Sequence, residues 1–194
     1  MTHMLKQTLA GLRVLIVFTV LLGVLYPLGV WAVSRIPGLE SKAEGSQLAA
    51  NGQVVGSSLI GIDPVPADPA HDPYFHPRPS AASLPASGGS NKSGFNDDLV
   101  KAVQERKAAI AQREGVPQDA VPADAVTASA SGLDPDISPA YADLQVARVA
   151  RNTGLPVSQV QALVQKYTSG DGIGIPGVNV LELNLAVAQD AEVS

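Results

Sequence analysis

Apolar residues divide the chain into one long uninterrupted block and, after it, a series of short patterned segments. The block runs from Val14 to Val33, twenty residues without a charge. At about 1.5 Å of rise per residue, a helix of this length matches the hydrocarbon core of a bilayer, about 30 Å thick. The block is apolar on all sides, which is typical of a segment surrounded by lipid. We predict a membrane-spanning helix over residues 14–34, preceded by a tail (1–13) and followed by a domain (35–194).

Three segments of the predicted domain have the pattern of β-strands. Residues 51–62 carry valine, leucine and isoleucine among glycines and serines, which predicts a strand or a short hairpin. Val121–Ser131 includes alternating small apolar residues and ends before a glycine. Val178–Val187 is rich in valine and leucine on both faces, as in a strand that is buried on two sides. We therefore expect strands in all three segments.

Three other segments have helical spacing and helix end signals. Residues 96–114 begin with an asparagine, whose side chain can accept hydrogen bonds from the free N–H groups of a first turn. Residues 138–153 begin with Ser-Pro and are followed by a glycine, a suitable start and end for a helix. Residues 156–169 begin with a proline and carry an apolar stripe. Helices and strands together predict a small α+β domain.

A proline-rich segment separates the first predicted strand from the first helix of the domain. Seven prolines occur between Pro64 and Pro85. Proline cannot donate to a β-ladder, and it disfavours helix in the residue before it. Long ordered loops are often functional or packed on a surface, so we favour that interpretation over a flexible linker. Arg78 stands between two of these prolines. A guanidinium on a stiff loop suits carboxylates or carbonyls, either of this chain or of a partner.

Charge limits the function classes that the domain can serve. From Arg35 onward, eighteen acidic residues stand against eleven basic ones, which leaves a net charge of −7. This balance argues against a nucleic-acid partner, which requires a basic face, and permits a mild local enrichment of cations. The chain has no cysteine, in agreement with an exported domain. Long domains translocate largely regardless of charge, so we predict the tail inside and the domain outside the membrane.

A cleaved signal peptide is the alternative to a retained span. Lys6 and Arg13 form a basic region before the apolar block, and residues 32–34 resemble a small-residue cleavage site. The block is longer than the usual signal-peptide core of about 7–15 residues, which favours an anchor. Cleavage after Ser34 would instead release an exported binding protein.

Within the predicted span, Thr19 and Gly23 form a pair of small residues one turn apart. Such pairs let two membrane helices approach closely, and Pro27 removes the hydrogen bond to the Gly23 carbonyl and can kink the helix. One side of the span therefore suits packing against another helix, although exposure of the same residues to lipid explains the pattern equally well.

A glycine-rich stretch over Ser87–Ser93 resembles a phosphate-binding loop but fails its requirements. Ala86 occupies the first glycine position, and Asn91 replaces the glycine before Lys92. The preceding segment is rich in proline, whereas a phosphate-binding loop follows a strand. We interpret the stretch as a tight turn whose N–H groups can hold an acceptor of this chain or of a partner.

Other polar residues form no recognisable catalytic or metal-binding arrangement. His71, Asp72 and His76 lie in the proline-rich segment without the spacing of a metal site, so we treat them as polar loop residues and predict no metal. Gln145, Arg148 and Asn152 fall on one face of the predicted helix 138–153. A solvated face is the favoured explanation of that stripe.

Three sequence blocks, taken in order behind an N-terminal span, closely resemble the C subunit of the Kdp-type potassium-transporting ATPase. They are Tyr74–Ala81 (YFHPRPSA), Ala86–Asn91 (ASGGSN) and Gly132–Pro139 (GLDPDISP). The likeness continues through residues 145–150 and 178–184 and covers nearly the whole chain. The first two blocks are specific as a pair.

The resemblance implies a non-catalytic accessory subunit with one span in a bacterial plasma membrane and an extracytoplasmic domain. Its partners would be a channel-like potassium-binding subunit, a P-type ATPase subunit and a very small membrane subunit, with no cofactor of its own. Proposed roles in the family are to stabilise the assembly, to influence potassium entry and to raise the apparent nucleotide affinity of the pump. The residues that match the motifs, and that we predict to bind partners or to support the fold, are Tyr74, Phe75, Arg78, Pro79, Ser80, Ser87, Gly88, Gly89, Ser90, Asn91, Asp134, Pro135, Gln145 and Arg148.

A nucleotide-binding regulator of the pump is the alternative function. It would use residues 88–92 or Gln145 and Arg148 and would require the domain to lie in the cytosol. An outward domain meets little ATP, so we favour stabilisation of the complex together with an effect at the outer potassium entrance, where an acidic domain attracts cations modestly.

Overall fold

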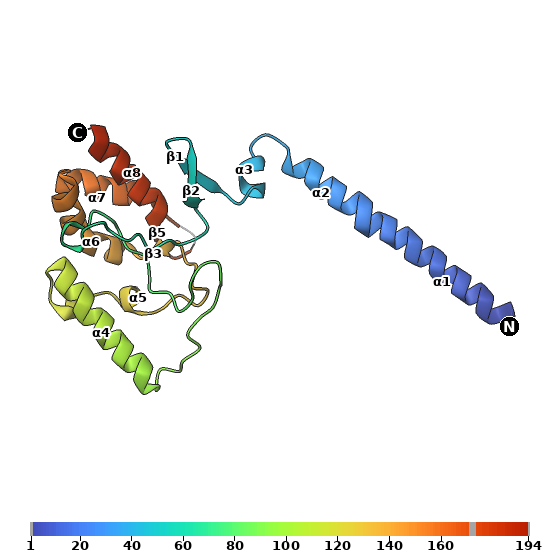
Figure 1. The fold of residues 1–194 in the computed structure, drawn as a ribbon, viewed down its shortest axis with the longest axis horizontal. Coiled ribbons are helices and arrows are strands. Elements are labelled where there is room, and N and C mark those ends of the chain that lie inside the picture. The colour runs from blue at the N-terminus through green and yellow to red at the C-terminus, as the bar shows by residue number, and fades with distance from the viewer. Residues whose placement is uncertain (1, 171–173, 194) are drawn as a thin grey trace. The chain divides into compact units, whose positions relative to one another are not determined.

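Two compact units, residues 1–46 and 47–194, make up the structure, which is a computed structural model that describes residues 2–170 and 174–193 (Figure 1). The first unit contains the long apolar helix and the second contains the folded domain. Each unit is described separately below.

The first unit is dominated by a continuous helix, which covers the predicted range 14–34 and also extends back to Thr2 through the predicted tail. It consists of α1 (Thr2–Val20), a π-helical turn η1 (Leu21–Leu25) and α2 (Tyr26–Ser34), and a short helix α3 (Glu40–Ala43) follows. Residues 3–34 are long and apolar enough to cross a membrane. The π-helical turn lies just before Pro27, which has no N–H to donate and so disturbs the regular ladder.

The small residues of this helix lie where the sequence places them. The Thr19 hydroxyl donates to the Leu15 carbonyl of the preceding turn at 2.8 Å, so its polar group is satisfied within the helix. A Cβ on Gly23 would lie 3.9 Å from the Thr19 methyl group. Gly23 therefore leaves a shallow notch in the helix surface. The proposed packing of Thr19, Gly23 and Pro27 against another helix stays a prediction.

The second unit mixes short antiparallel strands with helices and confirms the predicted α+β class. Strands β1 (Gln47–Ala50) and β2 (Gln53–Ser57) form a hairpin, and β3 (Asp136–Ile137), β5 (Gly177–Asn179) and β4 (Thr168–Ser169) form a three-stranded sheet in that order. The helices are α4 (Asp97–Glu114), α5 (Ala123–Val126), α6 (Pro139–Thr153), α7 (Val157–Lys166) and α8 (Val180–Val193). Two 3-10 turns, η2 (Pro69–His71) and η3 (Gln118–Ala120), complete the described elements.

Helix end signals in the sequence predict α4 and α6 correctly. The third predicted helix (156–169) is also present as α7, but it ends at Lys166, and residues 168–169 form β4 instead of its last turn. The Asn96 side chain accepts from the Leu99 N–H at 3.1 Å, and the Ser138 hydroxyl accepts from the Tyr141 N–H at 3.1 Å. Gly115 and Gly154 end α4 and α6 in the left-handed conformation that glycine adopts without strain. The predicted hairpin is also present, a few residues earlier than the predicted range.

The strand predicted over Val121–Ser131 is wrong, because this segment contains the short helix α5 and an irregular stretch. Pro122 precedes α5 and has a conformation suited to a helix start. The Asp124 carboxylate accepts from both the N–H and the hydroxyl of Ser138, at 2.8 and 2.9 Å. This contact with the start of α6 holds residues 123–126 as a single turn of helix. The alternation of small apolar residues in the sequence did not indicate it.

The strand predicted over Val178–Val187 is also wrong beyond its first residues. Strand β5 ends at Asn179, whose side chain accepts from the Glu182 N–H at 3.1 Å in the manner of a helix cap. Val180, Leu183 and Val187 are buried at helical spacing. Apolar residues between these positions conceal the helical period in the sequence, which is why a buried strand was predicted.

The core of the domain surrounds α6, which packs against α4, α7 and α8. The proline-rich segment contributes to this core through Phe75, which is fully buried. A side-chain amide of α8 also holds it, because Asn184 accepts from the Phe75 N–H at 2.7 Å and donates to the Phe75 carbonyl at 2.9 Å. The segment is therefore packed on the domain, as predicted, and is not a flexible linker.

Candidate functional site

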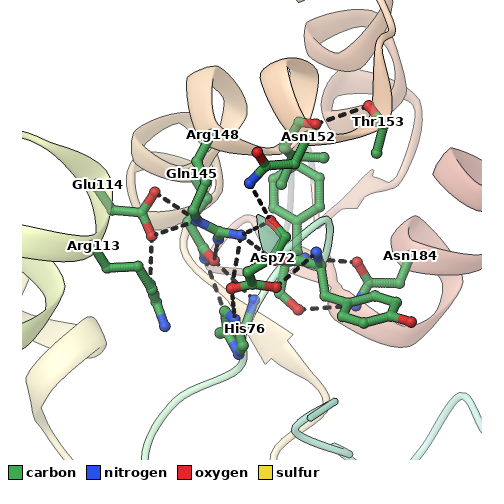
Figure 2. Close-up of polar contacts among 12 residues, drawn as sticks. Asp72, His76, Arg113, Glu114, Gln145, Arg148, Asn152, Thr153 and Asn184 are labelled. Carbon is green, nitrogen blue, oxygen red and sulfur yellow. Dashed lines mark hydrogen bonds and ion pairs between the residues drawn. The ribbon is translucent and has the colours of Figure 1, made fainter. Parts of the chain in front are cut away.

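A cluster of buried polar side chains joins the proline-rich segment to α4 and α6 (Figure 2). Its members, named here the Arg148 cluster, are Asp72, His76, Glu114, Gln145 and Arg148, and none is more than 9% exposed. Burial of a charge is costly unless the charge is paired and hydrogen-bonded. The partners of these five side chains therefore decide what the cluster can do.

Arg148 is the centre of the cluster and uses all three guanidinium nitrogens. Its Nε donates to the two carboxylate oxygens of Glu114 at 3.1 and 3.0 Å. Its Nη1 donates to the carbonyls of Asp72 and Tyr74 at 2.9 and 2.8 Å and lies 3.0 Å from the Asp72 carboxylate. Its Nη2 donates to Gln145 at 3.0 Å. One side chain of α6 thus connects the end of α4 to Asp72 and Tyr74 of the proline-rich segment.

The expectation of a solvated polar stripe on this helix is wrong. Gln145 is fully buried and Arg148 is 3% exposed. Asn152, the third member of the stripe, donates from Nδ2 to the Asp72 carbonyl at 2.8 Å. The stripe faces a segment whose backbone groups have no secondary-structure partners, so polar side chains are needed there to satisfy them.

Two side-chain amides bind consecutive residues of the segment in the same way. Gln145 accepts from the His76 N–H at 2.8 Å and donates to the His76 carbonyl at 3.2 Å. Asn184 makes the equivalent pair of hydrogen bonds with Phe75. Each amide therefore replaces a neighbouring strand, and together they fix the backbone on both sides of the Phe75–His76 peptide.

His76 lies between two carboxylates. Its Nε2 lies 2.6 Å from Asp72, and its Nδ1 lies 2.7 Å from Asp63 in the stretch after the hairpin. Asp72 also accepts from the Tyr74 N–H at 3.1 Å. Within the described residues, no group of three or more histidine and acidic side chains is placed to hold a metal ion. His76 instead connects Asp63, in the stretch after the hairpin, to Asp72 of the Arg148 cluster.

The pKa of the Asp72 carboxyl reflects these contacts. Burial raises this pKa, but hydrogen bonds from His76 and the Tyr74 N–H, with the charges of His76 and Arg148, lower it by more. The pKa of Asp72 therefore lies below its ordinary value of 3.8. The ionised form of this carboxyl, relative to its protonated form, is more stable in the folded domain than in the unfolded chain.

The lowered pKa of Asp72 predicts a loss of stability in acid. A depressed carboxyl pKa stabilises the folded state above the ordinary value of 3.8, and this contribution falls as pH drops through the folded-state pKa. We expect the free energy of unfolding, measured by urea titration of the full-length chain in detergent, to decrease as the pH is lowered below about 4. The fall should be smaller in Asp72→Asn, and equal slopes in the two proteins would contradict the prediction.

Arg78 fixes the loop around it through contacts within the chain. Its Nη1 donates to the Asp134 carboxylate at 2.8 Å, and its Nη2 donates to the Thr127 carbonyl at 3.3 Å. The backbone at Asp134 also meets Gly61, where a Cβ would lie 2.2 Å from the Asp134 carbonyl oxygen. The Pro135 carbonyl accepts from the Val180 N–H at 3.0 Å. The first and third motif stretches of the sequence thus support the start of α8.

The serine- and glycine-rich motif lies against the stretch at 129–132. Gly88 donates from its N–H to the Ser131 carbonyl at 2.7 Å, and the Pro79 carbonyl accepts from the Ser129 N–H at 2.9 Å. The hydroxyls of Ser80 and Ser87 donate to the carbonyls of residues 132 and 131. A Cβ at Gly89 would lie 2.8 Å from the Ala130 carbonyl oxygen. Ser90 and Asn91, the other residues of the motif, are exposed. The turn therefore holds an acceptor of its own chain.

The cluster contains residues that the sequence motifs did not single out. Glu114 was expected only as the end of a helix, and Asp72 and His76 only as polar loop residues. A usable signal was present for the helical members, because Gln145 and Arg148 lie beside the apolar positions Val146 and Val149 on the helix. For the acidic partners no local signal exists, since their burial depends on residues far away in the chain.

Comparison with known proteins agrees with the resemblance of the motifs. The profile of the family described as K+-transporting ATPase, c chain, matches residues 8–189. The potassium-transporting ATPase KdpC subunit of Kineococcus radiotolerans is 47% identical over 199 residues, which cover 98% of this chain and 97% of that protein. The KdpC subunit of Streptomyces avermitilis is 47% identical over 207 residues, with 93% and 92% covered. That of Mycobacterium tuberculosis is 43% identical over 190 residues, with 94% and 97% covered.

The matched region includes both the apolar helix and the Arg148 cluster, so the likeness extends over both units of the structure. With identity of this level over nearly the full length, the chain belongs to the KdpC family, the C subunits of the K+-transporting Kdp ATPase complex.

Proposed function

We propose that the chain is a non-catalytic accessory subunit of a high-affinity, ATP-driven potassium uptake complex. It stabilises the assembly of the channel-like potassium-binding subunit, the P-type ATPase subunit and the small membrane subunit. Residues 14–34 anchor it in the plasma membrane, with residues 1–13 in the cytoplasm and the domain outside. The acidic domain then acts at the outer potassium entrance.

The observation that carries this proposal is the internal pairing of the Arg148 cluster. Arg148 and Glu114 contact each other, and Asp72 is shared between Arg148 and His76. A catalytic base or nucleophile requires a face open to substrate, whereas these groups are turned toward one another. Their role is to fix an irregular segment as a rigid surface, which suits a subunit that binds other subunits.

The sequence supports the same division of labour. It contains no Asp-Lys-Thr-Gly phosphorylation motif, so phosphoryl transfer belongs to the P-type ATPase subunit. The excess of acidic residues after Arg35 raises the local cation concentration modestly, and less so at physiological salt. The helix surface at Thr19 and Gly23 provides a place for a partner helix to pack.

Membrane topology provides the test of this function. We expect a cysteine introduced by Ser93→Cys, at an exposed loop position of this cysteine-free chain, to react with a membrane-impermeant maleimide in intact cells. A cysteine introduced by Thr8→Cys, in the predicted tail, should react only after lysis. The reverse pattern would contradict an outward domain and would support the alternative, a nucleotide-binding regulator in the cytosol.

A further inference from the structure

A groove of about 700 Å³ runs between β1 and α8 on the folded domain. Figure 1 shows the hairpin beside α8, and both belong to the second unit. The groove is lined by apolar side chains in its middle and by two glutamates, and its main residues are Leu48, Ala50, Tyr167, Glu182, Leu185 and Glu192. It is separate from the Arg148 cluster, none of whose members lines it.

Helix α8 presents two different faces. One face carries Val180, Leu183 and Val187 into the core. The other face lines the groove with Glu182, Leu185 and Glu192, at helical spacing. The two glutamates are ten residues apart, which corresponds to about 15 Å along a helix. The groove wall therefore has an apolar centre and a negative charge near each end.

The opposite wall of the groove is a strand with a free edge. The hairpin sheet has two strands in the order β1–β2, so one edge of β1 pairs with no other strand in the part of the chain that the structure describes. The groove is lined by residues 48–50 of that strand. An unpaired edge offers a row of backbone N–H and C=O groups to an incoming extended chain.

We propose that the groove binds an extended, basic segment of a partner subunit, which adds to β1 as a third strand. Apolar side chains of that segment cover Leu48 and Leu185, and its lysines or arginines lie near Glu182 and Glu192. This inference rests on the proposed function, because it identifies the surface through which the domain binds a partner of the complex.

Charge complementarity selects this occupant over others. None of the residues that line the groove is basic, and the domain as a whole is acidic. A second copy of the chain that paired at β1 would bring like-charged glutamates together, and an anionic lipid surface would be repelled. The strand also begins thirteen residues after Ser34, at most about 45 Å of extended chain, so a segment that emerges near the membrane can reach it.

Charge reversal tests the electrostatic part of the proposal. The full-length, tagged chain carrying both Glu182→Lys and Glu192→Lys would be co-expressed with the other subunits and purified in mild detergent. We expect about fivefold less partner per tagged chain than for the unmodified protein at low salt, from two partly exposed ion pairs. The double variant Glu105→Lys with Asp143→Lys makes the same charge change at exposed helix positions outside the groove and should leave assembly unchanged.

A direct contact test identifies the occupant. Gln189→Cys places a thiol in the groove of this cysteine-free chain, and a benzophenone maleimide attached there should cross-link to a partner subunit. We expect the adduct to map to a segment with alternating apolar and basic residues, and Asp143→Cys to give no such adduct. Adducts only to lipid or to a second copy, or the same adducts from both positions, would overturn the proposal.

Hydrogen exchange tests the strand pairing. Backbone amides of residues 47–50 should exchange more slowly in the assembled complex than in the chain alone, because a third strand would hold the free edge of β1. Unchanged exchange there would overturn the β-pairing. If the unmodified chain itself fails to copurify with the other subunits, the proposed function fails; if it copurifies and the groove variant behaves like its control, only this inference fails.

Discussion

Arg148→Met should lower the free energy of unfolding of the domain by about 3–5 kcal/mol. The change removes every hydrogen bond that the guanidinium makes and leaves the carboxylate of Glu114 and the carbonyls of Asp72 and Tyr74 buried with fewer donors. Arg113 still donates to Glu114 at 2.7 Å and His76 still contacts Asp72. The two carboxylates nevertheless lose a buried cation, and buried polar groups left short of partners are costly, which is why one substitution has so large an effect. Urea unfolding of the full-length chain in detergent, followed by circular dichroism, measures it.

Arg151→Met is the matched control for this variant. Arg151 lies three residues further along α6 and is exposed, so its loss should change the free energy of unfolding by no more than about 0.5 kcal/mol. Arg148→Lys should recover little of the lost stability, because an ammonium cannot reproduce the planar arrangement of guanidinium donors. Equal losses in Arg148→Met and Arg151→Met would show that the cluster contributes little to stability.

Phe75→Ala is expected to cost about 3–5 kcal/mol, because it removes a buried aromatic side chain and leaves a cavity. Phe75 is fully buried and comes from a segment without regular secondary structure. The amide of Asn184 holds its backbone, so the surrounding structure cannot easily close over the cavity. The same urea titration measures the loss, and limited proteolysis between residues 64 and 85 should become faster.

The chain provides its own control for the aromatic change. Phe95 is 98% exposed, so Phe95→Ala removes the same side chain without creating a cavity and should leave the unfolding midpoint nearly unchanged. If Phe75→Ala unfolds at the same urea concentration as Phe95→Ala, then the proline-rich segment is not part of the cooperative core.

Local signals in the sequence predict much of the fold. The uninterrupted apolar block predicts the long helix, because an uncharged apolar run of this length is sufficient to span a bilayer and depends on no contact with the rest of the chain. Asn96 and Ser138 predict helix starts through hydrogen bonds that span three residues, so no distant contact is needed. The motif blocks indicate the family, and the comparisons confirm it.

Local patterns fail where distant contacts choose between two conformations. Residues 180–187 are apolar on nearly all sides, so their pattern fits a buried strand as well as a buried helix. The segment is helical because, in this conformation, Val180, Leu183 and Val187 fall on one face and are buried together in the core. Residues 123–126 become a turn of helix because Asp124 binds the start of α6.

The sequence by itself determined the anchor-like helix, the helix ends, the α+β class and the family of this protein, because each depends on neighbouring residues or on motifs that remain together in the chain. Only the tertiary structure decided that Gln145 and Arg148 are buried and that their partners are Asp72, His76 and Glu114. The physical reason is that a polar face on a helix is either solvated or paired, and the pairing groups come from residues as many as 76 positions away.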